Sequence, residues 1–126
     1  MRPATLAEVA ELSTGGDSFD RSLANFLDEF YAAPSAHALA REPKSLVPLF
    51  ADLGRVQDAY LAAVAEELAR QFNLSRPSWI DSDSRKLHRP WFASPLAALR
   101  AVLLLESPPG FRSRNLFVSE NALARA

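Results

Sequence analysis

The residues that could carry out acid–base or metal chemistry are few and scattered along this 126-residue chain. Its two histidines, His37 and His88, are far apart, and neither has a second ligand at helical or turn spacing. The sequence contains no HExxH pair, no glycine-rich phosphate loop and no GxSxG nucleophile turn. It also contains no cysteine, which excludes a disulfide framework, a thiolate nucleophile and a cysteine-ligated metal. We therefore expect neither a bound metal nor a cofactor.

Paired carboxylates occur at Asp28-Glu29, at Glu66-Glu67 and at Asp81-x-Asp83. Adjacent side chains on a helix point about 100° apart, so the first two pairs do not converge on one reacting atom. The third pair lies among serines, where Asp and Ser side chains commonly form turns. We expect solvated surfaces at all three places and predict that the protein is not an enzyme. A small enzyme whose carboxylates converge only in the fold is an alternative.

Two segments, residues 89–92 and 111–117, interleave arginine with aromatic side chains. This combination is enriched at the centres of protein interfaces. The predicted partner-binding residues are Arg89, Trp91, Phe92, Phe111, Arg112, Arg114, Asn115, Phe117 and Asn121. Charge reversal at Arg112 and Arg114 is expected to weaken partner binding without unfolding the protein. In the alternative interpretation, Trp79, Trp91 and Phe92 fold inward and anchor a long loop. Both interpretations hold together if an anchored loop presents its arginines rigidly.

Charge is unevenly distributed along the chain. Residues 1–73 contain six Lys/Arg and eleven Asp/Glu, whereas residues 74–126 contain eight and four. Twelve of the fourteen cations are arginine, whose planar guanidinium suits paired bonds to carboxylate or phosphate. Either the two halves neutralise each other within one fold, or an exposed basic patch contacts an acidic protein or nucleic acid. Of these two partners we favour a protein, since the pI near 6.1 is low for a dedicated nucleic-acid binder.

The composition, 48% hydrophobic and 23% charged, is typical of a globular protein rather than a disordered one. The most apolar stretch, Leu96–Leu105, contains Arg100 and is far shorter than the roughly 20 residues of a membrane span. No apolar signal core follows Met1. We expect a single domain over residues 1–126, soluble and cytoplasmic, with no membrane partner.

The N-terminal half predicts three helices. Thr5-Leu6-Ala7-Glu8 forms a capping box, and Gly15-Gly16 ends the short helix that follows. Asp17 is expected to cap a second helix, which Pro34 stops and in which large apolar residues recur at helical spacing. Those residues are Phe19, Leu23, Phe26, Leu27 and Phe30. Ser35 caps a brief third helix through Ala40.

In the remaining chain, we expect residues 46–53 to form a connector that lies across the core. The longest helix is expected from about Asp52 to Phe72, and Asn73 should end it. Residues 75–94 form an ordered loop. Ser94-Pro95 begins a helix through Glu106 that is apolar almost all round, so it should be the most buried element. Leu116-Phe117-Val118 docks as an extended segment, and residues 119–126 close the chain as a small helix. The predicted class is all-α, a bundle of about five helices.

Four segments carry a resemblance to a known family: residues 26–31, 59–66, 89–92 and 106–123. They resemble an uncharacterised family of small bacterial proteins, mostly actinobacterial, and the last segment is the most specific. Related domains are similar to the C-terminal part of helix-turn-helix regulators. Members often lie beside nucleotidyltransferase-like toxins, which implies an antitoxin or accessory role. The resemblance brings no catalytic residue with it.

Together these observations predict a non-enzymatic protein-interaction module, an antitoxin-like partner that occludes a cognate toxin enzyme. The alternative is a nucleic-acid-associated transcriptional regulator that uses the basic C-terminal half. Direct DNA contact through the first helix is disfavoured, because Glu8 and Glu11 stand where cations would be needed. A homodimer that pairs through the helix from Pro95 is a further alternative.

Overall fold

The computed structural model describes residues 2–94 and 99–125. Helix accounts for 59% of the chain and strand for 3%, which confirms the all-α class. The helices within the described residues are α1 (Leu6–Thr14), α2 (Phe19–Ala32), α3 (His37–Ala40), α4 (Val47–Gln71), α5 (Arg100–Glu106) and α6 (Pro109–Arg112). Two short 3₁₀ turns, η1 (Ser78–Asp81) and η2 (Asp83–Arg85), and two strands, β1 (Trp91–Phe92) and β2 (Leu116–Phe117), complete them.

Local capping sets the first two helices, as the sequence predicts. The Thr5 hydroxyl accepts a hydrogen bond from Glu8 N at 3.1 Å, and the Glu8 carboxylate accepts one from Thr5 N at 3.1 Å. Gly15 terminates α1. The prediction of Asp17 as the cap of α2 is wrong by one residue. Ser18 caps that helix, because its Oγ accepts the amide of Arg21 at 3.2 Å.

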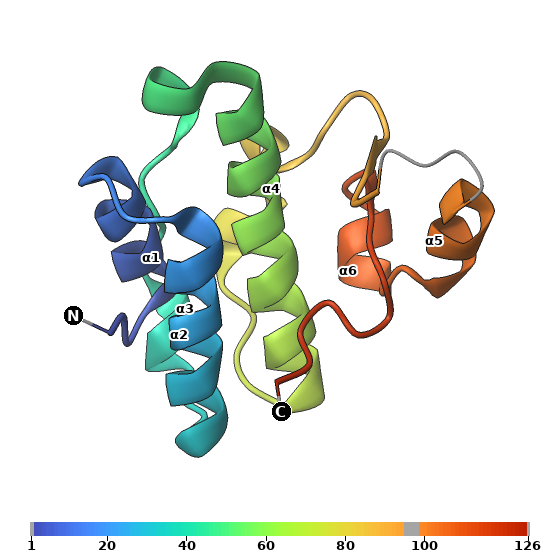
Figure 1. Ribbon diagram of the computed structural model, residues 1–126. Helices are drawn as coiled ribbons and strands as arrows, with labels where there is room; N and C mark the ends of the chain where they lie inside the picture. Colours follow the sequence, from blue (N-terminus) through green and yellow to red (C-terminus); the bar gives the residue numbers. More distant parts are fainter. Residues whose placement is uncertain (1, 95–98, 126) are drawn as a thin grey trace.

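Helix α4 runs through the middle of the molecule, with α1, α2 and α3 on one side and α6 on the other (Figure 1). The apolar stripe of α2 packs toward it, with Leu23, Phe26, Leu27 and Phe30 buried. Every residue of α4 from Leu61 to Ala65 is fully buried. A helix buried all round must be covered on several sides, and residues from both halves of the chain provide that cover.

The start of α4 differs from the prediction for residues 46–53. Residues 47–50 form one helical turn, and Ala51 then breaks the helix with φ 51° and ψ −122°, so the regular helix begins at Asp52 as predicted. Leu46 is fully buried, but Leu49 and Leu53 are more than half exposed, so the connector does not lie across the core. At the other end, Asn73 has φ 54°, the left-handed geometry expected of a helix stop.

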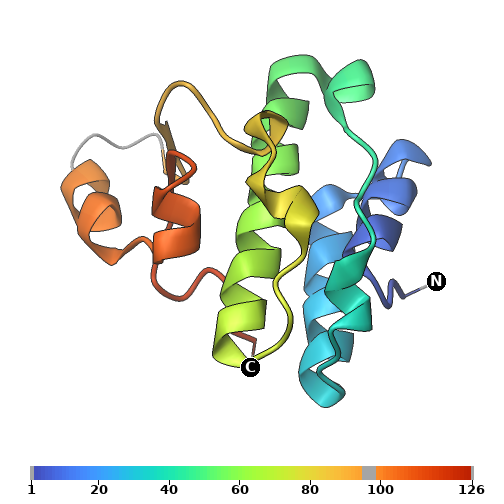
Figure 2. The same ribbon diagram turned by 180° about the vertical axis from the view of Figure 1, so that it is seen from behind.

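Residues 75–94 form the ordered loop that the sequence predicts, and the loop follows the rear face of α4 (Figure 2). Trp79 is buried, and its indole N–H donates to Leu39 O at 3.0 Å. The guanidinium of Arg85 lies 4.9 Å from the centre of the Trp79 ring and is itself buried. An aromatic anchor and a buried arginine therefore hold this loop against the helices.

The C-terminal third corrects two predictions. The start of the helix expected from Pro95 lies outside the described residues, and its described part, α5, is not the most buried element: only Leu103 in it is buried. Residues 120–123 form turns, and the small helix expected at the C-terminus does not occur among the described residues 119–125. The extended segment at Leu116-Phe117 is confirmed as β2. None of the described helices combines the length and hydropathy that a membrane span requires.

Candidate functional site

A two-stranded parallel ladder carries α5 away from the helical body. Trp91 pairs with Leu116 and Phe92 with Phe117, although the two strands are far apart in the sequence. The amide of Trp91 donates to Asn115 O at 2.8 Å, and Phe92 stacks on Phe117 with ring centres 5.2 Å apart. Parallel strands need a long crossover connection, and α5 and α6 form it here. The ladder is therefore the base of an arm, formed by α5, that projects from the body (Figure 1).

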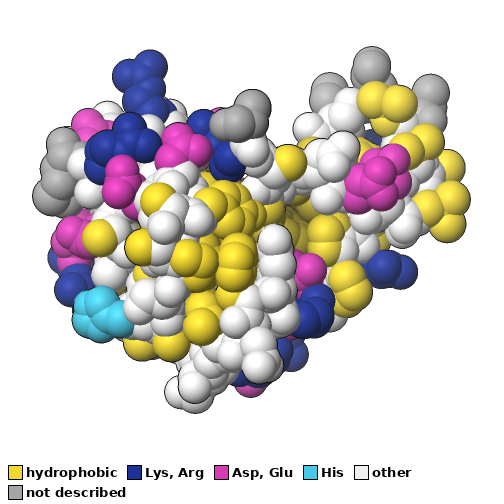
Figure 3. Space-filling model, turned by 90° about the horizontal axis from the view of Figure 1, so that it is seen from below, with side chains coloured by type: hydrophobic (Ala, Val, Ile, Leu, Met, Phe, Trp, Pro, Cys, Tyr) yellow, Lys and Arg dark blue, Asp and Glu magenta, His cyan; other side chains and the backbone are white. Residues whose placement is uncertain are grey.

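Helix α5 is apolar and largely exposed on this arm. Leu99, just before the helix, is 42% exposed, and Leu105 is 83% exposed. Val102 and Leu104 are nearly half exposed. Seen from below, hydrophobic side chains gather at the outer edge of the arm (Figure 3). We call these four residues the α5 surface: Leu99, Val102, Leu104 and Leu105.

The C-terminal end of α5 is held firmly to the ladder. Ser107 is fully buried, and its hydroxyl donates to Leu116 O at 2.8 Å and accepts from Val118 N at 3.3 Å. The guanidinium of Arg112 donates to Ser107 O at 3.0 Å. At the other end of the helix, the guanidinium of Arg100 lies 5.1 Å from the centre of the Phe92 ring. The α5 surface is therefore exposed on a helix that is anchored at both ends, with a cation at each end.

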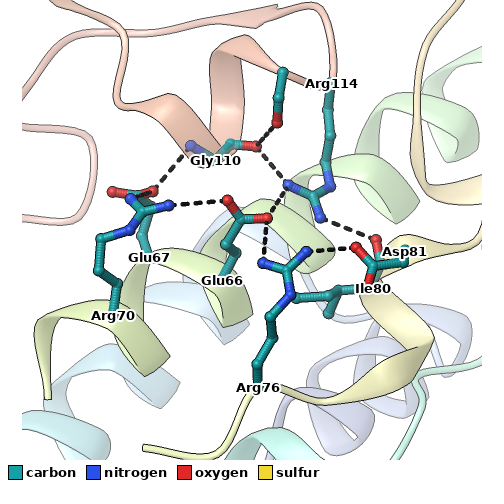
Figure 4. Close-up of polar contacts among 9 residues, drawn as sticks. Glu66, Glu67, Arg70, Arg76, Ile80, Asp81, Gly110 and Arg114 are labelled. Atoms are coloured by element: carbon teal, nitrogen blue, oxygen red, sulfur yellow. Dashed lines mark hydrogen bonds and ion pairs between the residues drawn. The ribbon is translucent and has the colours of Figure 1, made fainter. Parts of the chain in front are cut away.

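A buried ion-pair network attaches α6 to α4 (Figure 4). Arg114 is 2% exposed and donates to the Glu66 carboxylate at 2.9 Å, to Gly110 O at 2.6 Å and to Ile80 O at 2.9 Å. The neighbouring Glu67 carboxylate accepts the amide of Gly110 at 2.9 Å. These bonds join α4, the η1 turn and α6 in one place. They fix the position from which the arm projects.

Glu66 is the carboxylate shared by this network, since Arg76 and Arg70 each lie 3.0 Å from it in addition to Arg114. Its burial opposes ionisation, but hydrogen bonds and charge from Arg114 and Arg76 outweigh that effect and hold the pKa of Glu66 below its ordinary value. Glu66 therefore remains ionised, and each arginine retains its partner. The expectation of a merely solvated Glu66-Glu67 pair is wrong, because both side chains are mostly buried in ion pairs.

The structure divides the predicted partner-binding residues into three groups. Phe111, Arg114 and Phe117 are buried, so they cannot form the contact surface as predicted. Phe111 packs on Tyr60 with ring centres 4.9 Å apart. Arg114 makes three hydrogen bonds within the protein, so the expectation that its charge can be reversed without unfolding is wrong. Trp91, Phe92 and Asn115 are half-buried around the ladder. Arg89, Arg112 and Asn121 are exposed.

Sequence reasoning missed the α5 surface because an all-round apolar helix is ordinarily a buried one. The single cation in that stretch, Arg100, was a weak signal of exposure. Whether a helix of this kind is covered depends on which elements pack against it. Among the described elements, helix α5 packs mainly against the short strand β2, and Leu103 is its one buried residue.

The basic half of the chain is neutralised in part. Four of its arginines pair with carboxylates of the acidic half: Arg76 and Arg114 with Glu66, Arg85 with Glu42 and Asp58, and Arg125 with Asp28. The other four cations form no ion pair with a described residue and are exposed; they are Lys86, Arg89, Arg100 and Arg112. Internal neutralisation therefore holds for part of the chain, and the exposed basic patch that contacts a partner stays a prediction. No group of three or more His, Asp or Glu side chains suitable for a metal ion occurs among the described residues.

Comparison with protein-family models, with curated proteins and with solved structures finds no match to this chain. The functional argument therefore depends on the chain's own residues.

Proposed function

We propose that this protein is a non-enzymatic interaction module that binds a cognate toxin-like enzyme and occludes it, as an antitoxin does. The observation that carries the proposal is the α5 surface, four large apolar side chains exposed on an anchored helix. Covering a leucine side chain is worth about 1.5–3 kcal/mol relative to leaving it in water. Leu99, Val102 and Leu105 are three residues apart and therefore lie on one side of the helix, and an exposed apolar patch typically marks an interaction site.

The form of the arm suits a helix-in-groove contact. The α5 surface supplies the apolar anchors, and a cation stands at either end of the helix, Arg100 at its start and Arg112 beside Ser107. A partner groove with an apolar floor and acidic rims would complement this arrangement. Because the ladder and the Arg114 network hold the arm in place, little ordering entropy is lost on binding.

The nucleic-acid alternative has weaker support. Half of the cations in residues 74–126 are engaged with carboxylates of the same chain, so fewer guanidinium groups remain for phosphates. An apolar surface such as that of α5 is also not what phosphate binding needs. We therefore retain the protein partner as the proposal.

The test is affinity purification of the tagged protein from its native cell lysate, with nuclease and moderate salt in the wash, followed by an activity assay of the recovered partner. We expect one stoichiometric enzyme, which the protein inhibits. The variant Leu105→Glu should lose both binding and inhibition, whereas Leu49→Glu, the same change at an exposed leucine of α4, should retain both.

Two outcomes would overturn the proposal. If Leu105→Glu and Leu49→Glu retain the partner equally, the α5 surface is not the contact. If the tagged protein retains nucleic acid that nuclease removes, and no protein, the regulator alternative replaces the proposal. Far-UV circular dichroism and thermal melts of both variants show whether the fold is intact, since both leucines are exposed in the free protein.

A further inference from the structure

A cavity of about 590 Å³ opens between α2, α4, β1 and the C-terminal segment, away from the α5 surface. This volume lies in the range of small-molecule sites, which are mostly apolar and contain a few polar groups. Its apolar lining includes Phe19, Leu23, Tyr60, Trp91, Val118 and Ala122. Phe19 and Tyr60 meet edge to face with ring centres 6.4 Å apart, so α2 and α4 together form an aromatic wall.

One buried polar group in this wall has no hydrogen-bond partner among the described residues. Gln57 is 8% exposed and lines the cavity, and its amide oxygen accepts no hydrogen bond from the part of the chain that the structure describes. A buried acceptor left unsatisfied is expensive, and such groups in native proteins call for an explanation. Gln57 lies one helical turn before Tyr60 on α4, so both side chains are on the same face of the helix. The oxygen itself is closed off in the free protein, so a ligand with a hydrogen-bond donor would satisfy it once the Gln57 amide turns toward the cavity.

The charge at the cavity is negative. Asp20 lines it and forms no ion pair with a described residue. Arg125, the other charged residue of the lining, is bound through Nε and Nη2 to Asp28, at 2.9 and 3.3 Å. Burial, reinforced by the nearby charge of Asp20, raises the pKa of Tyr60 to about 12, so its hydroxyl stays neutral. The unbalanced charge and the aromatic faces both favour a cation.

We propose that this cavity binds a small molecule that carries a protonated amine on a compact apolar body. The ammonium group faces Asp20 and the amide oxygen of Gln57, and the apolar body lies against the rings of Phe19, Tyr60 and Trp91. This inference does not depend on the partner protein. It can fail while the proposed function stands, and the reverse is equally true.

The probe is 2-phenylethylamine, titrated into the full chain by calorimetry and by NMR at neutral pH. We expect saturable binding that shifts the indole resonance of Trp91 and leaves that of the buried Trp79 unchanged. Two matched compounds serve as controls: 2-phenylethanol removes the charge, and phenylacetate reverses it. Both should bind at least about tenfold more weakly, since a hydrogen bond to a charged group is worth about 1.5–3 kcal/mol.

Two variants test the residues. Gln57→Met keeps the size of the side chain and removes the acceptor, and it should weaken binding of 2-phenylethylamine about tenfold or more. Asp20→Asn should weaken it about two- to fivefold, whereas Asp17→Asn, the same change at an exposed residue outside the cavity, should not.

The inference is overturned by any of three results: no saturable binding of 2-phenylethylamine, equal or tighter binding of 2-phenylethanol or phenylacetate, or unchanged affinity in Gln57→Met. A melt of each variant shows whether it is folded. If Gln57→Met fails to fold, the comparison of Asp20→Asn with Asp17→Asn decides alone, and equal affinities there would reject the cation site.

Discussion

Replacing Arg114 by alanine should destabilise the protein severely, because this buried side chain joins three parts of the fold. The substitution removes the bond to Glu66 at 2.9 Å and leaves two backbone carbonyls, of Gly110 and Ile80, without their donor. Removing one partner of a buried ion pair costs about 3–5 kcal/mol. Glu66 keeps Arg76 as a partner, so we expect the lower half of that range, about 3–4 kcal/mol.

The assay is urea unfolding followed by far-UV circular dichroism, together with a thermal melt. For a chain of 126 residues, 1 kcal/mol corresponds to about 4 °C, so the Tm of Arg114→Ala should fall by roughly 12–16 °C. Arg112→Ala is the matched control. Arg112 is exposed and donates to one carbonyl, that of Ser107, so its loss should cost less than about 1 kcal/mol.

A conservative variant separates charge from geometry. Arg114→Lys keeps the positive charge but cannot reach the Glu66 carboxylate and both carbonyls with one planar group, so its stability should lie between wild type and Arg114→Ala. Equal free energies of unfolding for Arg114→Ala and Arg112→Ala would refute the reasoning. That result would mean that the network in Figure 4 does not stabilise the fold.

Three further predictions concern stability. The ion pairs of Glu66 hold its pKa in the folded protein below the ordinary 4.5, so the stability that they provide is present above pH 4.5 and is lost as the pH falls through the folded pKa. Urea titrations from pH 7 to pH 3 should show this loss of stability. The loss should be smaller in Glu66→Gln. Gly54→Ala should destabilise the protein by about 1–3 kcal/mol despite the better helix propensity of alanine, because the new Cβ would overlap the backbone carbonyl of Leu46. The control is Gly15→Ala, where the nearest contact of the new Cβ would be 3.5 Å. Similar melting temperatures for the two variants would contradict the packing argument. Gln57→Met should raise the free energy of unfolding by about 1 kcal/mol, because it removes an unsatisfied buried oxygen; a less stable variant in urea would show that the amide is satisfied within the protein.

The two proposals use different parts of the molecule. The α5 surface lies on the projecting arm, whereas the cavity lies where the ladder meets α2 and α4. Trp91 belongs to both regions, since it pairs with Leu116 in the ladder and lines the cavity. A ligand in the cavity would therefore touch the base of the arm.

Local features were readable from the sequence alone. The Thr5–Glu8 capping box, the apolar stripe of α2, the helix start near Asp52 and the left-handed stop at Asn73 all depend on residues within one or two turns of each other. Backbone hydrogen bonding and side-chain periodicity at that range are set by the chain itself. The all-α class follows from such signals, and the structure confirms it.

Only the tertiary structure decided what is buried in the C-terminal third. The charge imbalance between the halves suggested internal pairing, but nothing in the sequence shows that Arg85 and Arg114 are buried while Arg89 and Arg112 are exposed. The apolar stretch of α5 indicated a core helix, yet the crossover between two short strands places it on an arm, and Leu103 is the only residue of α5 that is buried there. Burial depends on contacts between segments far apart in the sequence, and those contacts exist only once the ladder and the Glu66 network have formed.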